Sequence, residues 1–258
     1  MQSMGNCVSD NETPQVRSMV PPYSIPSEVP NMYAANPVQQ PQQQPQQQPQ
    51  QQAMFAQLVQ LLVGVQIIVA VDCSGSMGGH CGIPGDYRTR AQYVSDNLSP
   101  FIKQILDIDT DGIEMIFFGT YLEEYKVTSE NYPSILHKCL TNMGGTNTAA
   151  VIRRMYELKS PQATKTIGII ITDGSPNSEA DCFAQVDWIS RSVKNTTEFN
   201  INFLRIGEDH GAIQFLQSLD NYHTDGDNVF DVIDTAHFNE VFGSPDALYK
   251  LLAKTMFD

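Results

Sequence analysis

Oxygen-bearing side chains gather in three short segments that lie far apart in the sequence. Two of the segments carry an aspartate, Asp72-Cys73-Ser74-Gly75-Ser76 and Thr172-Asp173-Gly174, and the third, Gly144-Gly145-Thr146, carries a hydroxyl after a glycine pair. In the first segment the oxygen donors stand at alternate positions, so a tight turn can direct all of them to one point. Together the segments offer two carboxylates and three hydroxyls, from Asp72, Ser74, Ser76, Thr146 and Asp173.

This set of donors is typical of a site for a hard divalent cation. Carboxylate, hydroxyl and water oxygens suit Mg²⁺ or Mn²⁺ in near-octahedral geometry, and neither a thiol nor an imidazole is needed. Two carboxylates do not saturate such an ion, so the ion keeps at least one exchangeable position. The sequence therefore predicts a Mg²⁺ or Mn²⁺ site that can accept a carboxylate from another molecule.

Apolar strands alternate with amphipathic helices over the region that contains these segments. Strands are expected at Gln66–Val71, Ile113–Phe118, Leu122–Val127, Thr166–Ile171, Asn200–Ile206 and Val229–Val232. Helices are expected at Arg88–Ile108 (broken at Pro100), Tyr132–Leu140, Thr146–Leu158, Asp181–Val193, Ala212–Leu219 and Asp246–Met256. This alternation is typical of a doubly wound α/β fold, in which helices cover both faces of a parallel sheet.

The strand ends are the places where this fold class binds ligands. Ligands of doubly wound folds lie beyond the carboxyl ends of the strands. Asp72 directly follows the first expected strand, Asp173 follows another by two residues, and Thr146 stands at the start of an expected helix. The three segments are therefore expected at the ligand-binding edge of the sheet.

In their order and strand context, the three segments resemble the metal-ion-dependent adhesion site of von Willebrand factor type A (vWA) domains. The resemblance covers roughly Gln66–Asp258 and implies a mostly parallel sheet with one antiparallel edge strand, which the hairpin Ile113–Val127 would provide. It also implies that the first and fourth strands are neighbours, so that Asp72 and Asp173 converge. In that family the three hydroxyls coordinate the metal directly, and the two carboxylates bind it directly or through water.

One stretch departs from the pattern of that family. The loop Gly78–Asp86 is long and rich in glycine, and vWA domains usually enter the following helix sooner. Because the loop is expected beside the metal, it is expected to influence the choice of partner. Arg88 and Arg90 follow the loop, and they either flank an acidic ligand or solvate the start of the helix.

The first part of the chain differs in composition from the rest. Residues 1–52 are rich in proline and glutamine, and they are expected to be a disordered tail because they cannot bury enough apolar surface to offset the entropy of ordering. Residues 53–65 are interpreted as a lead-in helix or linker, and residues 66–258 as the vWA domain. The apolar stretch Ala53–Val71 is interrupted by glutamines and followed by Asp72, so no transmembrane span is expected.

Charge and cysteine content narrow the expected partners and location. The formal net charge of −14 disfavours nucleic acid as a partner. No signal peptide is recognisable and the five cysteines form no disulfide framework, so a cytoplasmic location is expected. The segment Met4–Ser9 fits the pattern for N-myristoylation of Gly5, which would add peripheral membrane association only if translation started at Met4.

The resemblance implies a metal-dependent binding module that coordinates an aspartate or glutamate of a protein partner, in the assembly or regulation of intracellular complexes. The sequence carries neither a Gly-x-Ser-x-Gly elbow nor a Cys/His arrangement, so no enzymatic activity is expected. One alternative is a scaffold that acts through the Gln/Pro-rich tail. The other is a Mg²⁺-dependent aspartate-nucleophile phosphatase built on Asp72, although Ser74 stands where that class needs a second carboxylate and Lys165 precedes its strand.

Overall fold

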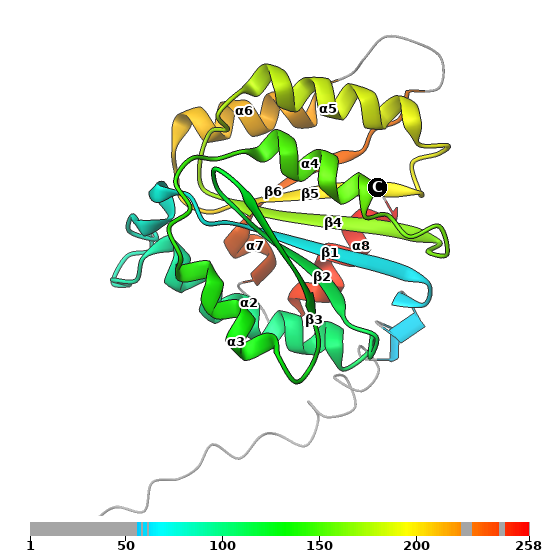
Figure 1. Cartoon of the computed structure of the whole chain (residues 1–258), viewed down its shortest axis with the longest axis horizontal. Helices are drawn as coiled ribbons and strands as arrows, with labels where there is room; N and C mark the ends of the chain where they lie inside the picture. The colour runs from blue at the N-terminus through cyan, green and yellow to red at the C-terminus, as the bar shows by residue number, and fades with distance from the viewer. Residues whose placement is uncertain (1–55, 58, 61, 223–228, 243–245, 258) are drawn as a thin grey trace, which may run out of the picture. The chain divides into compact units, whose positions relative to one another are not determined.

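Six strands form one sheet in the computed structural model of the chain, which describes residues 56–57, 59–60, 62–222, 229–242 and 246–257. The strands are β1 (Val65–Asp72), β2 (Ile113–Phe118), β3 (Leu122–Val127), β4 (Lys165–Thr172), β5 (Phe199–Arg205) and β6 (Ile233–His237). Their order is β3-β2-β1-β4-β5-β6 (Figure 1), and every neighbouring pair is parallel except the edge hairpin β2–β3. This confirms the predicted mostly parallel sheet with one antiparallel edge strand.

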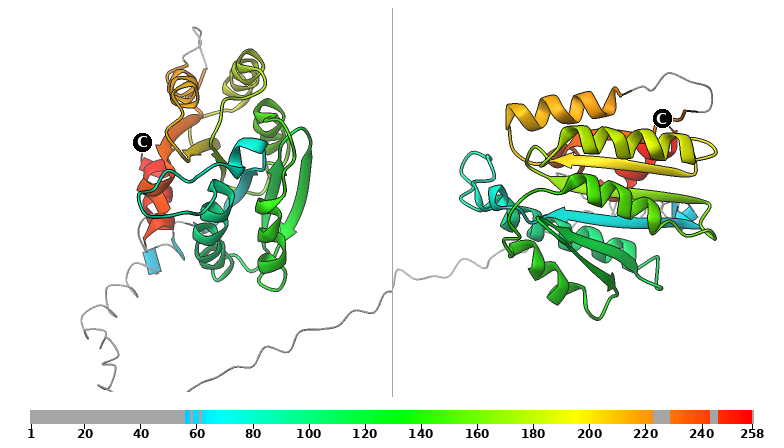
Figure 2. Two further views of the ribbon diagram at one scale, coloured as in Figure 1. Left: turned by 90° about the vertical axis from the view of Figure 1, so that its left-hand side faces the viewer. Right: turned by 45° about the horizontal axis from the view of Figure 1, so that its top comes forward.

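Helices cover both faces of the sheet (Figure 1; Figure 2). One face carries α4 (Thr148–Glu157), α5 (Glu179–Ser192) and α6 (His210–Asp220). The other face carries α2 (Arg90–Leu106), α3 (Tyr132–Leu136), η2 (His137–Leu140), α7 (Phe238–Phe242) and α8 (Ala247–Phe257). A short 3-10 helix, η1 (Gly75–Gly78), follows β1. The predicted doubly wound α/β architecture is thereby confirmed.

The central strand β1 shows why its sequence is apolar throughout. Ile67, Val69 and Val71 point into the core under α2 and α8, whereas Ile68 and Ala70 point into the core under α4 and α5. All five side chains are buried. A strand covered on both faces needs apolar residues at successive positions rather than at alternate ones.

The register of β1 and β4 sets the position of the functional edge. The two strands are parallel neighbours, and Val71 lies opposite Ile171. Asp72 and Thr172 therefore reach the carboxyl edge at the same level. The chain then continues from β1 to α2 on one face and from β4 to α5 on the opposite face, so this edge is the point at which ligands bind in doubly wound folds.

The expected helix break at Pro100 is wrong, because α2 runs through this residue without interruption. Pro100 and Asp96, whose carbonyl loses its hydrogen-bond donor, both lie on the exposed side of the helix, where water can satisfy that carbonyl. The opposite side carries Leu98, Phe101 and Ile102, whose burial in the core offsets the lost bond.

The last strand also differs from its expected position. Val229–Val232 is irregular, and the strand β6 begins directly after it and pairs with β5. Val232 is buried and its carbonyl accepts a hydrogen bond from the amide of Ile201, so its apolar character serves packing beside the sheet rather than the edge strand itself. The half-buried edge strand tolerates polar residues, which hid it in the sequence.

Two predictions about the start of the chain, the disordered tail of residues 1–52 and the lipidation of Gly5, lie outside the described residues. Within the described ranges, no helix combines the length and the apolar character that crossing a bilayer requires. The four cysteines in those ranges are buried and carry free thiols: Cys73, Cys81, Cys139 and Cys182.

Candidate metal centre

Asp72 ends β1 with a fully buried side chain whose two oxygens are both engaged. Its Oδ1 accepts a hydrogen bond from the amide of Ser74 at 2.7 Å, and its Oδ2 accepts one from the hydroxyl of Thr172 at 2.6 Å. Burial is the main reason why the pKa of Asp72 is raised to about 6; the donated hydrogen bonds lower it and the charge of Asp173 raises it. Because Thr172, which contacts Asp72, directly precedes Asp173, the two aspartates lie at the same edge of the sheet although they are far apart in sequence.

A chain of short contacts joins the first loop to the loop after β4. The hydroxyls of Ser74 and Ser76 are 3.0 Å apart, and the Ser76 hydroxyl donates to Oδ1 of Asp173 at 2.8 Å. Ser74 and Asp173 are buried, whereas Ser76 is exposed, so the cluster opens to solvent on the side of Ser76. In an octahedral Mg²⁺ site with bonds of about 2.1 Å, adjacent ligand oxygens are about 3 Å apart, which matches these contacts.

The segment that carries Thr146 is held against the same edge by its backbone. The amide of Gly75 donates to the carbonyl of Gly144 at 2.9 Å. The amide of Thr146 donates to the side-chain Oδ1 of Asn177 at 2.9 Å, and the carbonyl of Thr146 accepts a hydrogen bond from the amide of Asn177 at 2.8 Å. Among the described residues, the hydroxyl of Thr146 has no hydrogen-bond partner. These backbone contacts thus hold the fifth predicted residue, which is buried, at the same edge.

Glycine is required at Gly144 for this close approach of the loops. Its φ of +86° lies in the region that side-chain-bearing residues rarely adopt, and a Cβ there would lie 2.6 Å from the hydroxyl oxygen of Thr120. Gly145 is crowded as well, since a Cβ would come within 3.0 Å of the Asn177 side chain. The glycine pair that the sequence places before Thr146 therefore lets this segment pack closely against Thr120 and Asn177.

The structure brings one further residue to the site, Arg90, the first residue of α2. Its Nη1 forms an ion pair with Oδ2 of Asp173, the oxygen that Ser76 leaves free, and it also lies 3.4 Å from the carbonyl oxygen of Ser76. Sequence reasoning left Arg90 between flanking an acidic group and solvating a helix start. The ion pair shows that Arg90 does more than solvate the start of the helix, since it binds an acidic residue of the candidate site itself.

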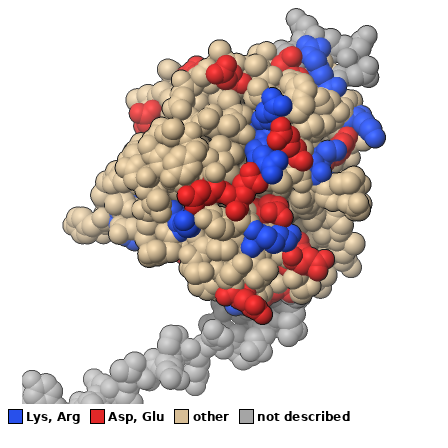
Figure 3. Space-filling model, in the orientation of Figure 1, with Lys and Arg blue, Asp and Glu red and all other residues tan. Residues whose placement is uncertain are grey.

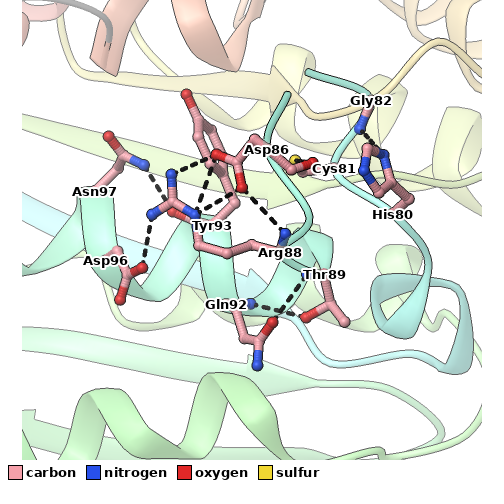
Figure 4. Close-up of polar contacts among 10 residues, drawn as sticks. All are labelled: His80, Cys81, Gly82, Asp86, Arg88, Thr89, Gln92, Tyr93, Asp96 and Asn97. Atoms are coloured by element: carbon pink, nitrogen blue, oxygen red, sulfur yellow. Dashed lines mark hydrogen bonds and ion pairs between the residues drawn. The ribbon is translucent and has the colours of Figure 1, made fainter. Parts of the chain in front are cut away.

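The glycine-rich loop before α2 folds back on itself, and Figure 4 shows the polar contacts within it. His80 and Thr89 form an isolated antiparallel bridge, and the amide of Arg90 donates to the carbonyl of Gly79 at 2.8 Å. Figure 2 shows the loop projecting beyond the carboxyl ends of the strands. The loop is therefore a hairpin whose returning segment delivers Arg90 to the carboxyl edge of the sheet.

Arg88 contacts acidic residues of the loop and of α2 rather than Asp173, as Figure 4 shows for Asp86 and Asp96. Its guanidinium binds Asp86 through several hydrogen bonds and Asp96 at 2.7 Å, and it lies over the ring of Tyr93. The hydrogen bonds from Arg88 lower the pKa of Asp86 to about 2. Arg88 thus stabilises the hairpin itself, and only Arg90 of the two arginines reaches Asp173.

The candidate donors are carboxylate and hydroxyl oxygens, and the part of the chain that the structure describes adds no cluster of side chains that commonly ligate metals. Among the described residues, no group of three or more His, Cys, Asp or Glu side chains is placed to hold a metal ion. A cation bound by Asp72 and Asp173 would therefore depend on the hydroxyls and on water. A cavity of about 270 Å³ opens beside Ser74 and Gly75, between the start of α2 and η2.

No known protein-family model matches the sequence, and no curated protein matches it in sequence. Several solved structures are similar in fold. The PilB minor pilin from Streptococcus sanguinis is 16% identical with a TM-score of 0.50, over 73% of this chain and 60% of the pilin chain. The D319A mutant of that pilin is 15% identical with a TM-score of 0.52, over 74% of this chain and 60% of the mutant chain.

A third solved structure, manganese-loaded TRAP protein from Plasmodium vivax, is 20% identical with a TM-score of 0.49, over 73% of this chain and 72% of that one. This chain spans about 60% of the length of the pilin chains that it matches. At such identities the likeness concerns the fold alone. The mostly parallel six-stranded sheet with one antiparallel edge strand is itself consistent with a vWA-like α/β fold.

Proposed function

We propose that this chain is a protein-binding module in which a Mg²⁺ or Mn²⁺ ion coordinates an acidic side chain of a partner. The ion is held by the five residues that carry suitable oxygens at the carboxyl edge of the sheet: Asp72, Ser74, Ser76, Thr146 and Asp173. The observation that carries the proposal is the continuous set of contacts from Ser74 through Ser76 to Asp173, at oxygen spacings that suit an octahedral ion.

The arrangement of these residues favours the capture of a carboxylate. A bound ion supplies a local positive charge on a chain whose net charge is −14, and it stabilises the charged form of the buried Asp72. Hydroxyl ligands add no charge, so the ion is left with attraction for a further anionic ligand. The exposed Ser76 marks the open side, and the cavity beside Ser74 gives room for the partner's neighbouring side chain.

The charges on the face seen in Figure 3 suit a protein partner better than a nucleic acid. On the face seen in Figure 3, the Lys and Arg side chains lie beside Asp and Glu side chains rather than forming a basic patch. Arg154, for example, binds Glu124 at 2.7 Å. Phosphate backbones are held by excess positive charge, which this face does not offer. We place this binding function in the assembly or regulation of cytoplasmic protein complexes.

The position of Lys165 argues against the phosphatase alternative. Lys165 begins β4, whereas Asp173 follows the end of that strand, so about 26 Å of extended chain separates them. The Nζ of Lys165 donates instead to the backbone carbonyl of Thr255 in α8. A lysine at the opposite end of the sheet does not steady a phosphate at Asp72, and we propose that the domain binds without catalysing a reaction.

Calorimetric titration of the full chain with Mn²⁺ and Mg²⁺ tests the metal step. We expect saturable binding by the wild type and a loss of affinity of roughly hundredfold or more in Asp72→Ala. Asp107→Ala is the matched control, because it removes an exposed aspartate that only pairs with Lys103. Equal binding by the wild type and Asp72→Ala would rule out this site.

Partner capture separates this function from the scaffold alternative. Pull-downs from native extract are compared for the full chain, for a chain lacking residues 1–52, and for both with EDTA present. We expect capture that survives loss of the tail and disappears with EDTA. Capture that ignores EDTA and disappears with the tail would favour the scaffold.

A further inference from the structure

Arg90 adds a positive charge to a site that is already expected to hold a cation. Its guanidinium forms an ion pair with Asp173, whose side chain is fully buried, whereas the Arg90 side chain is 22% exposed. The Nε of Arg90 is buried and has no hydrogen-bond partner among the described residues. Partial burial of this charged group costs free energy, and the ion pair with Asp173 offsets only part of the cost because Nε stays without a partner.

The surrounding backbone is built to admit this side chain. Gly207 has a φ of +86°, and a Cβ there would lie 3.1 Å from the Nε of Arg90. On the other side, a Cβ at Gly79 would lie 3.7 Å from Nη1. The start of α2 is fixed by a capping box between Thr89 and Gln92. The arginine therefore occupies a prepared position and is not a freely moving surface residue.

The charges of the site show what Arg90 changes. With Asp72 and Asp173 ionised, the guanidinium leaves the empty site with a net charge of −1 and the ion-loaded site with +1. A carboxylate from a partner then brings the loaded site to neutrality. Without Arg90 the loaded site is already neutral, and a partner carboxylate makes it negative. Inside a partly buried site such differences are large, because the effective dielectric constant is low.

We propose that Arg90 couples ion binding to the binding of an acidic partner. The guanidinium competes with the ion for Asp173, so it weakens ion binding when no partner is present. It also keeps positive charge at the loaded site, so it strengthens capture of a carboxylate. By linkage, the partner's carboxylate strengthens ion binding in the same proportion. This inference rests on the proposed metal-dependent function and adds that ion and partner bind as a cooperative pair.

The test measures both affinities in the full chain with Arg90→Gln. Mn²⁺ alone is titrated by calorimetry and electron spin resonance. Acetate is then titrated into the Mn²⁺-loaded protein, and displacement of ion-bound water is followed by water-proton relaxation at constant ionic strength. In Arg90→Gln we expect Mn²⁺ to bind about tenfold more tightly and acetate about tenfold more weakly. Arg90→Lys, which keeps the charge, is expected to shift both affinities less.

Arg191→Gln is the matched control, since it removes the same charge from an exposed arginine of α5 that pairs with Asp187 and lies outside the hairpin and the candidate site. It is expected to leave both affinities within about twofold of the wild type. Opposite shifts of the two affinities in Arg90→Gln do not arise from misfolding, which weakens both together.

Two results would overturn the coupling. If Arg90→Gln binds Mn²⁺ and acetate as the wild type does, or loses both, then Arg90 is only a structural residue and the metal site stands without it. If neither the wild type nor Arg90→Gln binds Mn²⁺ while both remain folded by circular dichroism, the proposed metal-dependent function fails and the coupling fails with it.

Discussion

A charged residue is buried at each end of β4, an aspartate at the carboxyl end and a lysine at the amino end, and the two have different polar partners. Asp173, just beyond the carboxyl end, shares its oxygens between the hydroxyl of Ser76 and the guanidinium of Arg90. Lys165, at the amino end, is buried and donates to the carbonyl of Thr255 at 2.5 Å. Burial lowers the pKa of Lys165, and the charge of the nearby Asp234 opposes that shift.

The difference lies in what each end leaves available. At the amino end the helix α8 closes over the lysine, and Thr255 also donates its hydroxyl to Asn202 at 3.2 Å. At the carboxyl end Ser76 is exposed, so the hydroxyl and carboxylate oxygens of Ser74, Ser76 and Asp173 form a cluster that reaches solvent. A closed polar cluster serves the fold, whereas an open one with spare oxygens suits an outside ligand.

The largest expected effect follows from Asp173→Ala, which removes the buried charge at the carboxyl end. Arg90 loses its ion-pair partner in a partly buried position, so the free energy of unfolding is expected to fall by about 4 kcal/mol. Mn²⁺ affinity is expected to fall roughly hundredfold or more, because a direct or water-mediated ligand is lost. Chemical denaturation and calorimetry measure the two effects. Unchanged Mn²⁺ affinity would remove this end of the sheet from the binding function.

Asp72→Asn separates the stability cost of the buried carboxylate from the role of that carboxylate in ion binding. A carboxyl whose pKa rises on folding, here from 3.8 to about 6, stabilises the fold only while protonated. That contribution is present below about pH 4 and is lost as the pH rises to about 6. Without metal, the wild type is therefore expected to lose about 3 kcal/mol relative to Asp72→Asn between pH 4 and pH 7.

Saturating Mn²⁺ is expected to reverse that order, because the ion stabilises the charged carboxylate of the wild type and the asparagine variant does not hold the ion. Denaturation at several pH values, with and without Mn²⁺, checks both parts. If the free energies of unfolding of the two proteins depend on pH in the same way in the absence of metal, then burial does not raise the pKa of Asp72.

The sequence predicts the sheet well because burial of the central strands on both faces is visible in short runs of neighbouring apolar residues. β2 and β3 have the expected bounds, and β1 and β4 each extend the expected strand by one residue at both ends. Strands buried on both faces need unbroken apolar runs, which are readable without a structure. The edge strand β6 and the continuous helix at Pro100 were missed, since both depend on which side faces water.

The oxygen donors of the site were also readable, because their positions after strands follow from the fold class. Arg90 was not, although it stands only two residues from Arg88 in the sequence. Which of the two arginines reaches Asp173 depends on where the hairpin before α2 returns, and that is set by backbone pairing between Gly79 and Arg90. Long-range pairing of a glycine-rich loop leaves no periodic signal.

A smaller effect, confined to stability, is expected at the amino end of β4. Lys165→Ala leaves the carbonyl of Thr255 without its donor and opens space in the core, so the free energy of unfolding is expected to fall by about 2 kcal/mol. Lys165→Met keeps the aliphatic packing and is expected to cost less. Mn²⁺ affinity should be unchanged in both variants. A loss of Mn²⁺ affinity comparable to that of Asp173→Ala would erase the distinction between the two ends.

The smallest expected effect isolates the contact between the loops of the carboxyl end. Gly144→Ala strains a backbone at φ +86° and places a Cβ 2.6 Å from the hydroxyl oxygen of Thr120, so about 1 to 2 kcal/mol of stability should be lost. Gly82→Ala is its control, because Gly82 has a φ of +85° and a Cβ there meets open space.

The control should therefore show the backbone strain alone and keep full Mn²⁺ affinity. Gly144→Ala should also weaken Mn²⁺ binding several-fold, since the Gly144 carbonyl holds the amide of Gly75 and so fixes the loop of Ser74 and Ser76. Denaturation and calorimetry on both variants make the comparison. If the two variants lose equal stability and both keep full Mn²⁺ affinity, the contact between Gly75 and Gly144 does not position the ligands, and the first loop alone sets their geometry.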